Sequence, residues 1–113
     1  MLPPLTDLLT QLRDELHRSL GDNLVRVTLY GSQARGDAGP DSDADVLIIL
    51  RRANESQNEM IHHIAYQIMW QHDFQPVLTL NIIDLPHYTL LRENRSSYLA
   101  NVEREGKSLW PAT

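Results

Sequence analysis

The stretch GSQARGDAGPDSDADVLIIL, residues 31–50, decides the fold, because it ties a Gly-Ser turn to two alternating aspartates on an apolar strand. Before it, apolar residues alternate with more polar ones, which predicts a strand over residues 24–30 that ends at the turn. The apolar run over residues 46–50 predicts that a second strand, over residues 44–50, is central and buried on both faces. The turn therefore lies at the edge of a sheet.

The first two residues of this stretch predict a phosphate-binding turn. Gly31 lets the backbone approach a ligand closely or adopt a positive φ, and Ser32 is expected to cap a short helix over residues 33–35. The N-terminus of a helix has free N–H groups and attracts phosphate. Arg35 has two interpretations, either a guanidinium that contacts the same phosphates or a solvated helix residue.

Asp43 and Asp45 predict a metal site. Residues two apart on a strand share a face, so their carboxylates would point the same way and repel each other. A hard divalent cation with oxygen ligands relieves that repulsion, and Mg²⁺ is the expected ion. Asp41 and Ser42 follow Gly39 and Pro40, and we interpret them as ordinary turn residues.

The pattern of Gly-Ser, ten residues and Asp-x-Asp resembles the hallmark of the DNA polymerase β-like nucleotidyltransferases. Within that superfamily, GSQARGD…SDAD is similar to the minimal nucleotidyltransferase (MNT) proteins of bacteria and archaea, and a weaker likeness continues through YLANVEREGKSLW. The resemblance implies a small α+β fold of the polymerase β-like kind, with a mixed short β-sheet and helices packed on one face. It also implies that residues 1–113 form a single minimal nucleotidyltransferase domain.

The resemblance assigns chemistry to the same residues. In the family, AMP passes from ATP to a hydroxyl group and pyrophosphate leaves, with two metal ions stabilising the entering and leaving oxygens. Asp43 and Asp45 would then be the catalytic residues and would hold two Mg²⁺ ions. Gly31 and Ser32 would hold the β- and γ-phosphates of ATP, and Arg35 would add its charge to them.

One feature departs from the family pattern. Active members carry a third acid on the next strand, and this chain has none between Val77 and Ile83. Asp73 and Asp84 flank that strand, and Asn81, a weak metal ligand, is the nearest polar candidate within it. The sequence therefore predicts binding of metal and nucleotide, with transfer slowed or absent.

The resemblance also implies a partner. Similar minimal proteins are antitoxins that attach AMP to a tyrosine of a small helical HEPN-domain ribonuclease toxin, and a hetero-oligomer with such a toxin would complete the cleft. Two alternatives stay open. The chain could transfer a nucleotide to a small-molecule hydroxyl, as aminoglycoside-modifying enzymes do, or it could be an inactive antitoxin that neutralises its toxin by binding alone.

The remaining sequence predicts helices around the sheet. A leucine pattern between Pro3-Pro4 and Gly21 predicts an amphipathic first helix, and the Ser56-x-x-Glu59 capping box predicts a second one that ends near Gln71. Residues 77–83 predict a third strand that is closed by Asp84 and Pro86. Residues 96–105 predict a last helix, with Gly106 as its C′ residue and with Leu109 and Trp110 either docked on the core or bound to a partner.

Composition narrows the function classes. The net charge of −5 argues against stable binding of duplex nucleic acid, which needs a basic surface. The absence of cysteine excludes thiolate metal sites, and the five histidines show no i, i+4 pair of the zinc-binding type. No signal-peptide pattern or membrane-spanning apolar stretch is visible, so a cytoplasmic protein without membrane contact is expected.

Overall fold

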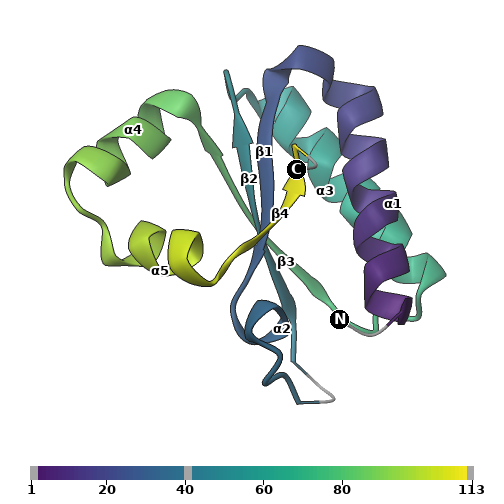
Figure 1. Ribbon diagram of the computed structural model, residues 1–113. Helices are drawn as coiled ribbons and strands as arrows, with labels where there is room; N and C mark the ends of the chain where they lie inside the picture. Colours follow the sequence, from purple (N-terminus) through teal and green to yellow (C-terminus); the bar gives the residue numbers. More distant parts are fainter. Residues whose placement is uncertain (1–2, 40–41, 112–113) are drawn as a thin grey trace.

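The computed structural model describes residues 3–39 and 42–111 as a four-stranded sheet with helices on both faces (Figure 1). The predicted turn residue Asp41 lies outside the described residues. The elements, in chain order, are α1 (Pro3–Leu20), the 3₁₀ turn η1 (Gly21–Asn23), β1 (Leu24–Tyr30), α2 (Ser32–Arg35), β2 (Ala44–Leu50), α3 (Glu55–Gln71), β3 (Leu78–Asp84), α4 (Leu85–Glu93), α5 (Ser97–Glu105) and β4 (Lys107–Trp110).

The sheet has the strand order β3-β2-β1-β4 and is mixed. β1 pairs antiparallel with both β2 and β4, whereas β2 pairs parallel with β3. β2 is thus a central strand, and every residue from Val46 to Leu50 is buried. The predicted strands over 24–30 and 44–50 are confirmed, and the third strand begins and ends one residue later than predicted. The α+β fold with a mixed sheet is confirmed as well.

Two hydrophobic clusters cover the two faces of the sheet. On one face the leucines of α1 and the apolar residues of α3 pack on alternate residues of β2, Val46 and Ile48 among them. On the other face Leu47 and Ile49 pack with residues of α4 and α5. The expectation that helices pack on one face only was therefore wrong. Successive side chains of β2 point to opposite faces of the sheet, so apolar residues lie on both faces. Helices must therefore pack on each face to bury them.

Several local predictions need correction at the helix ends. The cap of α3 is Asn54, whose side chain accepts a hydrogen bond from the Gln57 N–H, so the expected Ser56–Glu59 box is not its N-terminus. Gly106 follows α5 as expected, yet its φ of −71° is extended rather than left-handed. A β-carbon on Gly106 would collide with the Val102 carbonyl oxygen, so close packing explains this glycine.

Helix α4 and strand β4 were not predicted. Asp84 closes β3 as expected, but it also caps α4 by accepting a hydrogen bond from the His87 N–H at 2.9 Å. Beyond α5 the chain docks on the core as strand β4, where Trp110 pairs with Val27 and lies on His17 with ring centroids 4.1 Å apart. Docking, one of the two interpretations of the tail, is what the structure contains.

Candidate functional site

The Gly31 turn and the two aspartates meet at one end of the sheet, next to α2 (Figure 1). Gly31 directly follows β1, and Asp45 pairs with Tyr30, the last residue of that strand. Gly31 has φ 76° and ψ −158°, a backbone conformation that essentially only glycine adopts. A β-carbon added to Gly31 would lie 2.5 Å from Oδ2 of Asp45. The glycine therefore lets the turn lie directly against the carboxylate.

Gly31, and not Ser32, is the N-cap of α2, so the prediction that Ser32 caps the helix was wrong. The Gly31 carbonyl accepts hydrogen bonds from the N–H groups of Ala34 and Arg35, at 3.1 and 3.0 Å. Ser32 is consequently the first residue inside the helix, and its side chain is half-buried. The first N–H groups of any helix have no acceptor within that helix, so those of α2 are available to an anion.

Asp43 and Asp45 lie two residues apart at the start of β2, with Asp43 exposed and Asp45 half-buried. Partial burial raises the pKa of Asp45, the charge of Asp43 raises it further, and Arg35 opposes the shift. The Thr79 hydroxyl of β3 donates a hydrogen bond to Oδ2 of Asp43 at 3.0 Å. These two carboxylates can ligate a hard divalent cation, which would remove their mutual repulsion.

No three histidine, cysteine, aspartate or glutamate side chains lie close enough to hold a metal ion together within residues 3–39 and 42–111. The two β3 positions near the aspartates carry uncharged side chains. Thr79 pairs with Asp45, and Asn81 pairs with Leu47. The site thus offers two carboxylates and the hydroxyl of Thr79.

Asn81 belongs to a chain of hydrogen bonds that the sequence did not reveal. Its amide nitrogen donates to the Tyr98 hydroxyl at 2.8 Å, and Tyr98 donates to the Tyr30 hydroxyl at 3.1 Å. The two tyrosine rings meet edge to face, with centroids 5.6 Å apart. Burial raises the pKa of Tyr30 well above its usual range, and the bond with Tyr98 and the charge of Asp45 add to that shift. Tyr30 stays protonated beside the aspartates.

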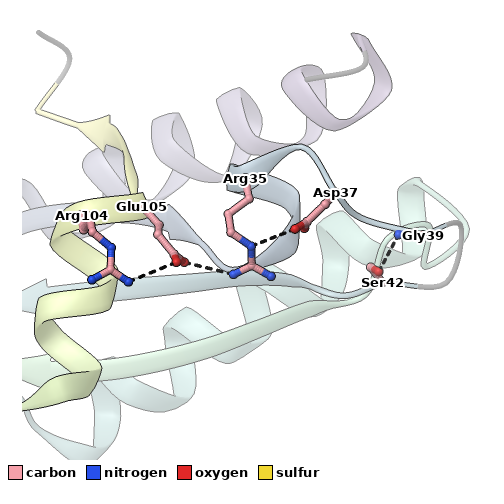
Figure 2. A network of polar contacts seen from close by, with 6 residues as sticks. All are labelled: Arg35, Asp37, Gly39, Ser42, Arg104 and Glu105. Atoms are coloured by element: carbon pink, nitrogen blue, oxygen red, sulfur yellow. Dashed lines mark hydrogen bonds and ion pairs between the residues drawn. The ribbon is translucent and has the colours of Figure 1, made fainter.

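Arg35 points into a network of ion pairs rather than standing free (Figure 2). Its Nε atom lies 3.1 Å from Oδ2 of Asp37, and its Nη1 atom lies 3.0 Å from Oε2 of Glu105, which comes from α5. Glu105 also pairs with Arg104 at 3.5 Å. Asp37 and then Glu105 raise the pKa of Arg35. The guanidinium therefore has two carboxylate partners already, and a phosphate would have to compete with them.

The structure brings Gly31, Ser32 and the two aspartates together and leaves Arg35 at their margin. Sequence reasoning missed Tyr30, Thr79 and Tyr98. Thr79 had a visible signal, since it is a polar residue two positions before Asn81 on the same strand. Tyr98 had none, because its contacts with Tyr30 and Asn81 span 68 and 17 residues of sequence.

None of the helices in the described part of the chain has both the length and the apolar character that crossing a bilayer requires.

The chain is similar to known proteins over most of its length. The family model described as "Nucleotidyltransferase domain" matches residues 9–102. A protein of Methanocaldococcus jannaschii described as a protein adenylyltransferase is 40% identical over 45 residues, which cover 40% of this chain and 46% of that protein. The match therefore spans less than half of that relative.

Solved structures share the fold at low identity. A structure from Sulfolobus solfataricus described as a nucleotidyltransferase has a TM-score of 0.52 and 20% identity, and the alignment covers 92% of this chain and 78% of that one. A toxin–antitoxin structure with AMP-PNP has a TM-score of 0.56 and 19% identity, over 92% and 74% of the two chains. A complex of tri-AMPylated Shewanella oneidensis HEPN toxin with MNT antitoxin has a TM-score of 0.50 and 18% identity, over 94% and 72%.

Proposed function

This chain belongs to the nucleotidyltransferase domain family, and we propose that it is an antitoxin that binds Mg-ATP and transfers AMP to a tyrosine of a HEPN-domain toxin. Asp43 and Asp45 are the catalytic metal ligands in this proposal. Gly31 and Ser32 bind the phosphates of ATP, and Arg35 stands at the edge of the phosphate site.

The contact between Gly31 and Asp45 carries the proposal. A β-carbon on Gly31 would lie 2.5 Å from the Asp45 carboxylate, so a phosphate that binds the N–H groups of α2 lies beside the proposed metal ligands. Binding of a triphosphate needs both the N–H groups of α2 and the two aspartates, since the phosphate charge is shared between N–H donors and Mg²⁺. Two carboxylates alone, or a helix N-terminus alone, would not select a nucleotide.

The residues fit Mg²⁺, because the pKa of Asp45 is raised in part by the charge of Asp43. A hard cation held by the two carboxylates would remove that repulsion. When bound, Mg²⁺ would neutralise charge on the triphosphate and on the acceptor oxygen.

In the proposed reaction the acceptor oxygen forms a bond to the α-phosphorus of ATP. The bond from that phosphorus to the bridging oxygen of the leaving group breaks, and pyrophosphate leaves with the electron pair. The hydroxyl proton passes to a carboxylate at the site or to water. Asp43 and Asp45 orient the reactants, while the α2 N–H groups hold the phosphates in line with the attack.

Similarity to antitoxins supports the choice of partner. A tri-AMPylated HEPN toxin bound to an MNT antitoxin is among the similar folds, and so is a toxin–antitoxin structure with the ATP analogue AMP-PNP. The net charge of −5 suits a basic, RNA-cutting partner, because opposite charges speed protein association.

Binding without transfer is the second candidate function, and one observation favours it. The uncharged residues Thr79 and Asn81 occupy the two β3 positions near the aspartates, and Asn81 is already bonded to Tyr98. A site with two carboxylates holds metal and nucleotide, but it lacks a third acid to ligate the metal that activates the acceptor hydroxyl. Such a chain would neutralise its toxin by binding to it, without transferring AMP.

Intact-mass spectrometry of the toxin separates the two candidates. A cognate HEPN-domain toxin is incubated with this chain, ATP and Mg²⁺, with an Asp43→Asn, Asp45→Asn variant as the matched control. Transfer predicts a toxin heavier by one or more AMP groups with the unaltered chain only. A toxin of unchanged mass that still binds the chain would contradict the transferase proposal and would support binding without transfer.

A further inference from the structure

We infer that Tyr98 of this chain is itself an acceptor of AMP, so that the chain adenylylates its own tyrosine when no other acceptor is bound. The inference rests on the proposed function, because it uses the same metal ligands and the same nucleotide. It places a modification site on α5, which lies on the face of the sheet opposite α1 and α3 (Figure 1).

The two aspartates share a face of the sheet with α5. Side chains alternate along β2, so Asp43 and Asp45 point to the same face as Leu47, which packs with residues of α4 and α5. On that face the Thr79 hydroxyl of β3 donates its hydrogen bond to Asp43, and Asn81 is the next residue of β3 on the same face. An acceptor for a nucleotide held by these aspartates must therefore lie on the α5 face.

The Tyr98 hydroxyl lies over β2, beside Asp45. It accepts a hydrogen bond from the Asn81 amide of β3 at 2.8 Å and donates one to the Tyr30 hydroxyl of β1 at 3.1 Å. β2 lies between β3 and β1, so a group bonded to side chains from both of these strands is held above β2. Tyr30 pairs with Asp45 and Asn81 pairs with Leu47, which sets the level of the hydroxyl along β2. A tyrosine hydroxyl is therefore already next to a proposed metal ligand.

The order of groups along the sheet suits an in-line attack. The Gly31 turn and α2 follow the last residue of β1, whereas Asn81 and its partner on β2 lie two residues further into the sheet than Asp45. Along the sheet, Asp45 thus lies between the N–H groups of α2, which hold the leaving phosphates in the proposed function, and the Tyr98 hydroxyl. An in-line displacement needs the leaving and attacking oxygens on opposite sides of the phosphorus.

Helix α5 is held over this face at several points. Leu99 and Val102 are buried in the cluster that covers the face, and Glu105 at the end of the helix pairs with Arg35 of α2 at 3.0 Å (Figure 2). The two hydrogen bonds of the Tyr98 hydroxyl fix its side chain as well. A hydroxyl held in place beside the reacting groups loses little further freedom on reaction, which favours transfer within the chain.

The chain has four tyrosines, and the other three are placed differently. Tyr66 lies on α3, whose buried residues pack on the opposite face of the sheet. The Tyr88 hydroxyl donates a hydrogen bond to Glu103 at 2.7 Å and belongs to α4. Tyr30 lies beside Asp45 and is the alternative acceptor, so the experiment must separate it from Tyr98.

The reaction balances without a further reactant. The Tyr98 oxygen forms a bond to the α-phosphorus of ATP, and the bond from that phosphorus to the bridging oxygen of the leaving group breaks. Pyrophosphate leaves with the electron pair, and the hydroxyl proton passes to the Asp45 carboxylate or to water. The product, a phosphodiester between AMP and Tyr98, occupies the place that a tyrosine of a toxin would need. Self-adenylylation therefore competes with transfer to a toxin.

Intact-mass spectrometry of the chain alone tests the inference. The unaltered chain, Tyr98→Phe and the matched control Tyr88→Phe are each incubated with ATP and Mg²⁺ in the absence of toxin. Tandem mass spectrometry of tryptic peptides then locates the added group. Cleavage after arginine gives separate peptides for Tyr30 (residues 27–35), for Tyr66 with Tyr88 (residues 53–92) and for Tyr98 (residues 96–104).

We expect the unaltered chain and Tyr88→Phe to gain one AMP group, on Tyr98 of the 96–104 peptide, and Tyr98→Phe to lose this gain. The rate constant should not depend on the concentration of the chain, because donor site and acceptor belong to one molecule. The peptide map of the unaltered chain decides the matter even if Tyr98→Phe does not fold.

Several results would overturn the inference. AMP on the peptide of another tyrosine, or on Ser96 or Ser97, would assign the acceptor elsewhere. A rate constant that rises in proportion to chain concentration would show that the acceptor belongs to a second copy of the chain.

A toxin added in a parallel reaction separates this inference from the proposed function. A chain of unchanged mass that adenylylates the toxin would overturn the inference and leave the proposed function standing. AMP on Tyr98 with a toxin of unchanged mass would uphold the inference and contradict the acceptor named in the proposed function. Unchanged masses of both proteins would contradict both.

Discussion

Gly31 and Asp45 touch so closely that a β-carbon on the glycine would lie 2.5 Å from Oδ2 of the aspartate. The turn that would bind phosphate and the strand that would bind metal are therefore one rigid unit. The contact depends on a backbone conformation, φ 76° and ψ −158°, that side chains exclude.

Replacing this glycine should damage both stability and binding. Gly31→Ala forces an unfavourable backbone and pushes the Asp45 carboxylate aside, so we expect a loss of roughly 1–3 kcal/mol in the free energy of unfolding, measured in urea. Affinity for Mg-ATP should fall at least about tenfold.

Gly36→Ala is the matched control for that variant. Gly36 also has a positive φ, 84°, but an added β-carbon would meet nothing within 4 Å. We expect it to lose roughly 1–2 kcal/mol from the left-handed backbone while keeping its nucleotide affinity. Equal nucleotide affinity in the two variants would contradict the role of the Gly31 contact.

The charge of Asp45 should lower the stability of the metal-free protein. Its pKa is raised in the folded chain by partial burial and by Asp43, so the folded state holds this proton more tightly than the unfolded state. The stability that results is present below the ordinary aspartate pKa of about 3.9 and is lost as the pH rises through the folded pKa. At pH 7 the ionised group therefore destabilises the fold.

Asp45→Asn should consequently raise Tm at neutral pH, and the gain should disappear as the pH approaches 3. Added Mg²⁺ should stabilise the unaltered chain and not the variant. Thermal unfolding followed by circular dichroism across this pH range measures both effects, with the exposed Asp14→Asn as control. A variant less stable than the unaltered chain at pH 7 would show that the ionised Asp45 carboxylate does not destabilise the fold.

A third carboxylate should strengthen the site. Asn81→Asp places an acid on β3 next to Tyr98, whose hydroxyl can turn and donate to it. We expect tighter Mg²⁺ binding and AMP transfer to the toxin at least about tenfold faster, with Asn81→Leu as the control that only removes the amide. Unchanged metal affinity in Asn81→Asp would argue that this position does not face the metal site.

The docked tail should contribute to stability. Trp110 pairs with Val27 and lies on His17 at 4.1 Å, so Trp110→Ala should lower the free energy of unfolding by roughly 1–3 kcal/mol. Trp70→Ala removes the same side chain where it is 66% exposed, and it should cost no more than about 0.5 kcal/mol. Similar losses in the two variants would contradict this difference between the tryptophans.

The central elements were predictable because their signals are local. Alternation in β1 and the leucine spacing of α1 each reflect one buried face, and the apolar run of β2 reflects burial on both faces. The pairing of Gly-Ser with Asp-x-Asp also predicted that the turn lies beside the aspartates, since both motifs flank adjacent strands. α4 was missed although Asp84 and Pro86 are helix-start residues, because the same residues also end strands.

What the sequence did not show depends on contacts between distant residues. The Tyr30–Tyr98 hydrogen bond and the Arg35–Glu105 ion pair join residues 68 and 70 positions apart, so no local pattern predicts them. The cover on the second face of the sheet required α4 and α5 together, and one of these helices was not recognised. The interpretation of Arg35 as a phosphate ligand stays a prediction, and the ion pair that Arg35 forms with Glu105 had no signal in the local sequence.

Calorimetric titration of ATP in the presence and absence of Mg²⁺ is the decisive measurement of whether Asp43 and Asp45 hold Mg-ATP against the Gly31 turn. If they do, the unaltered chain binds ATP only with Mg²⁺, and the folded Asp43→Asn, Asp45→Asn variant does not bind it under either condition. Equal ATP affinity in the unaltered chain and the double variant would show that these two aspartates do not hold the nucleotide.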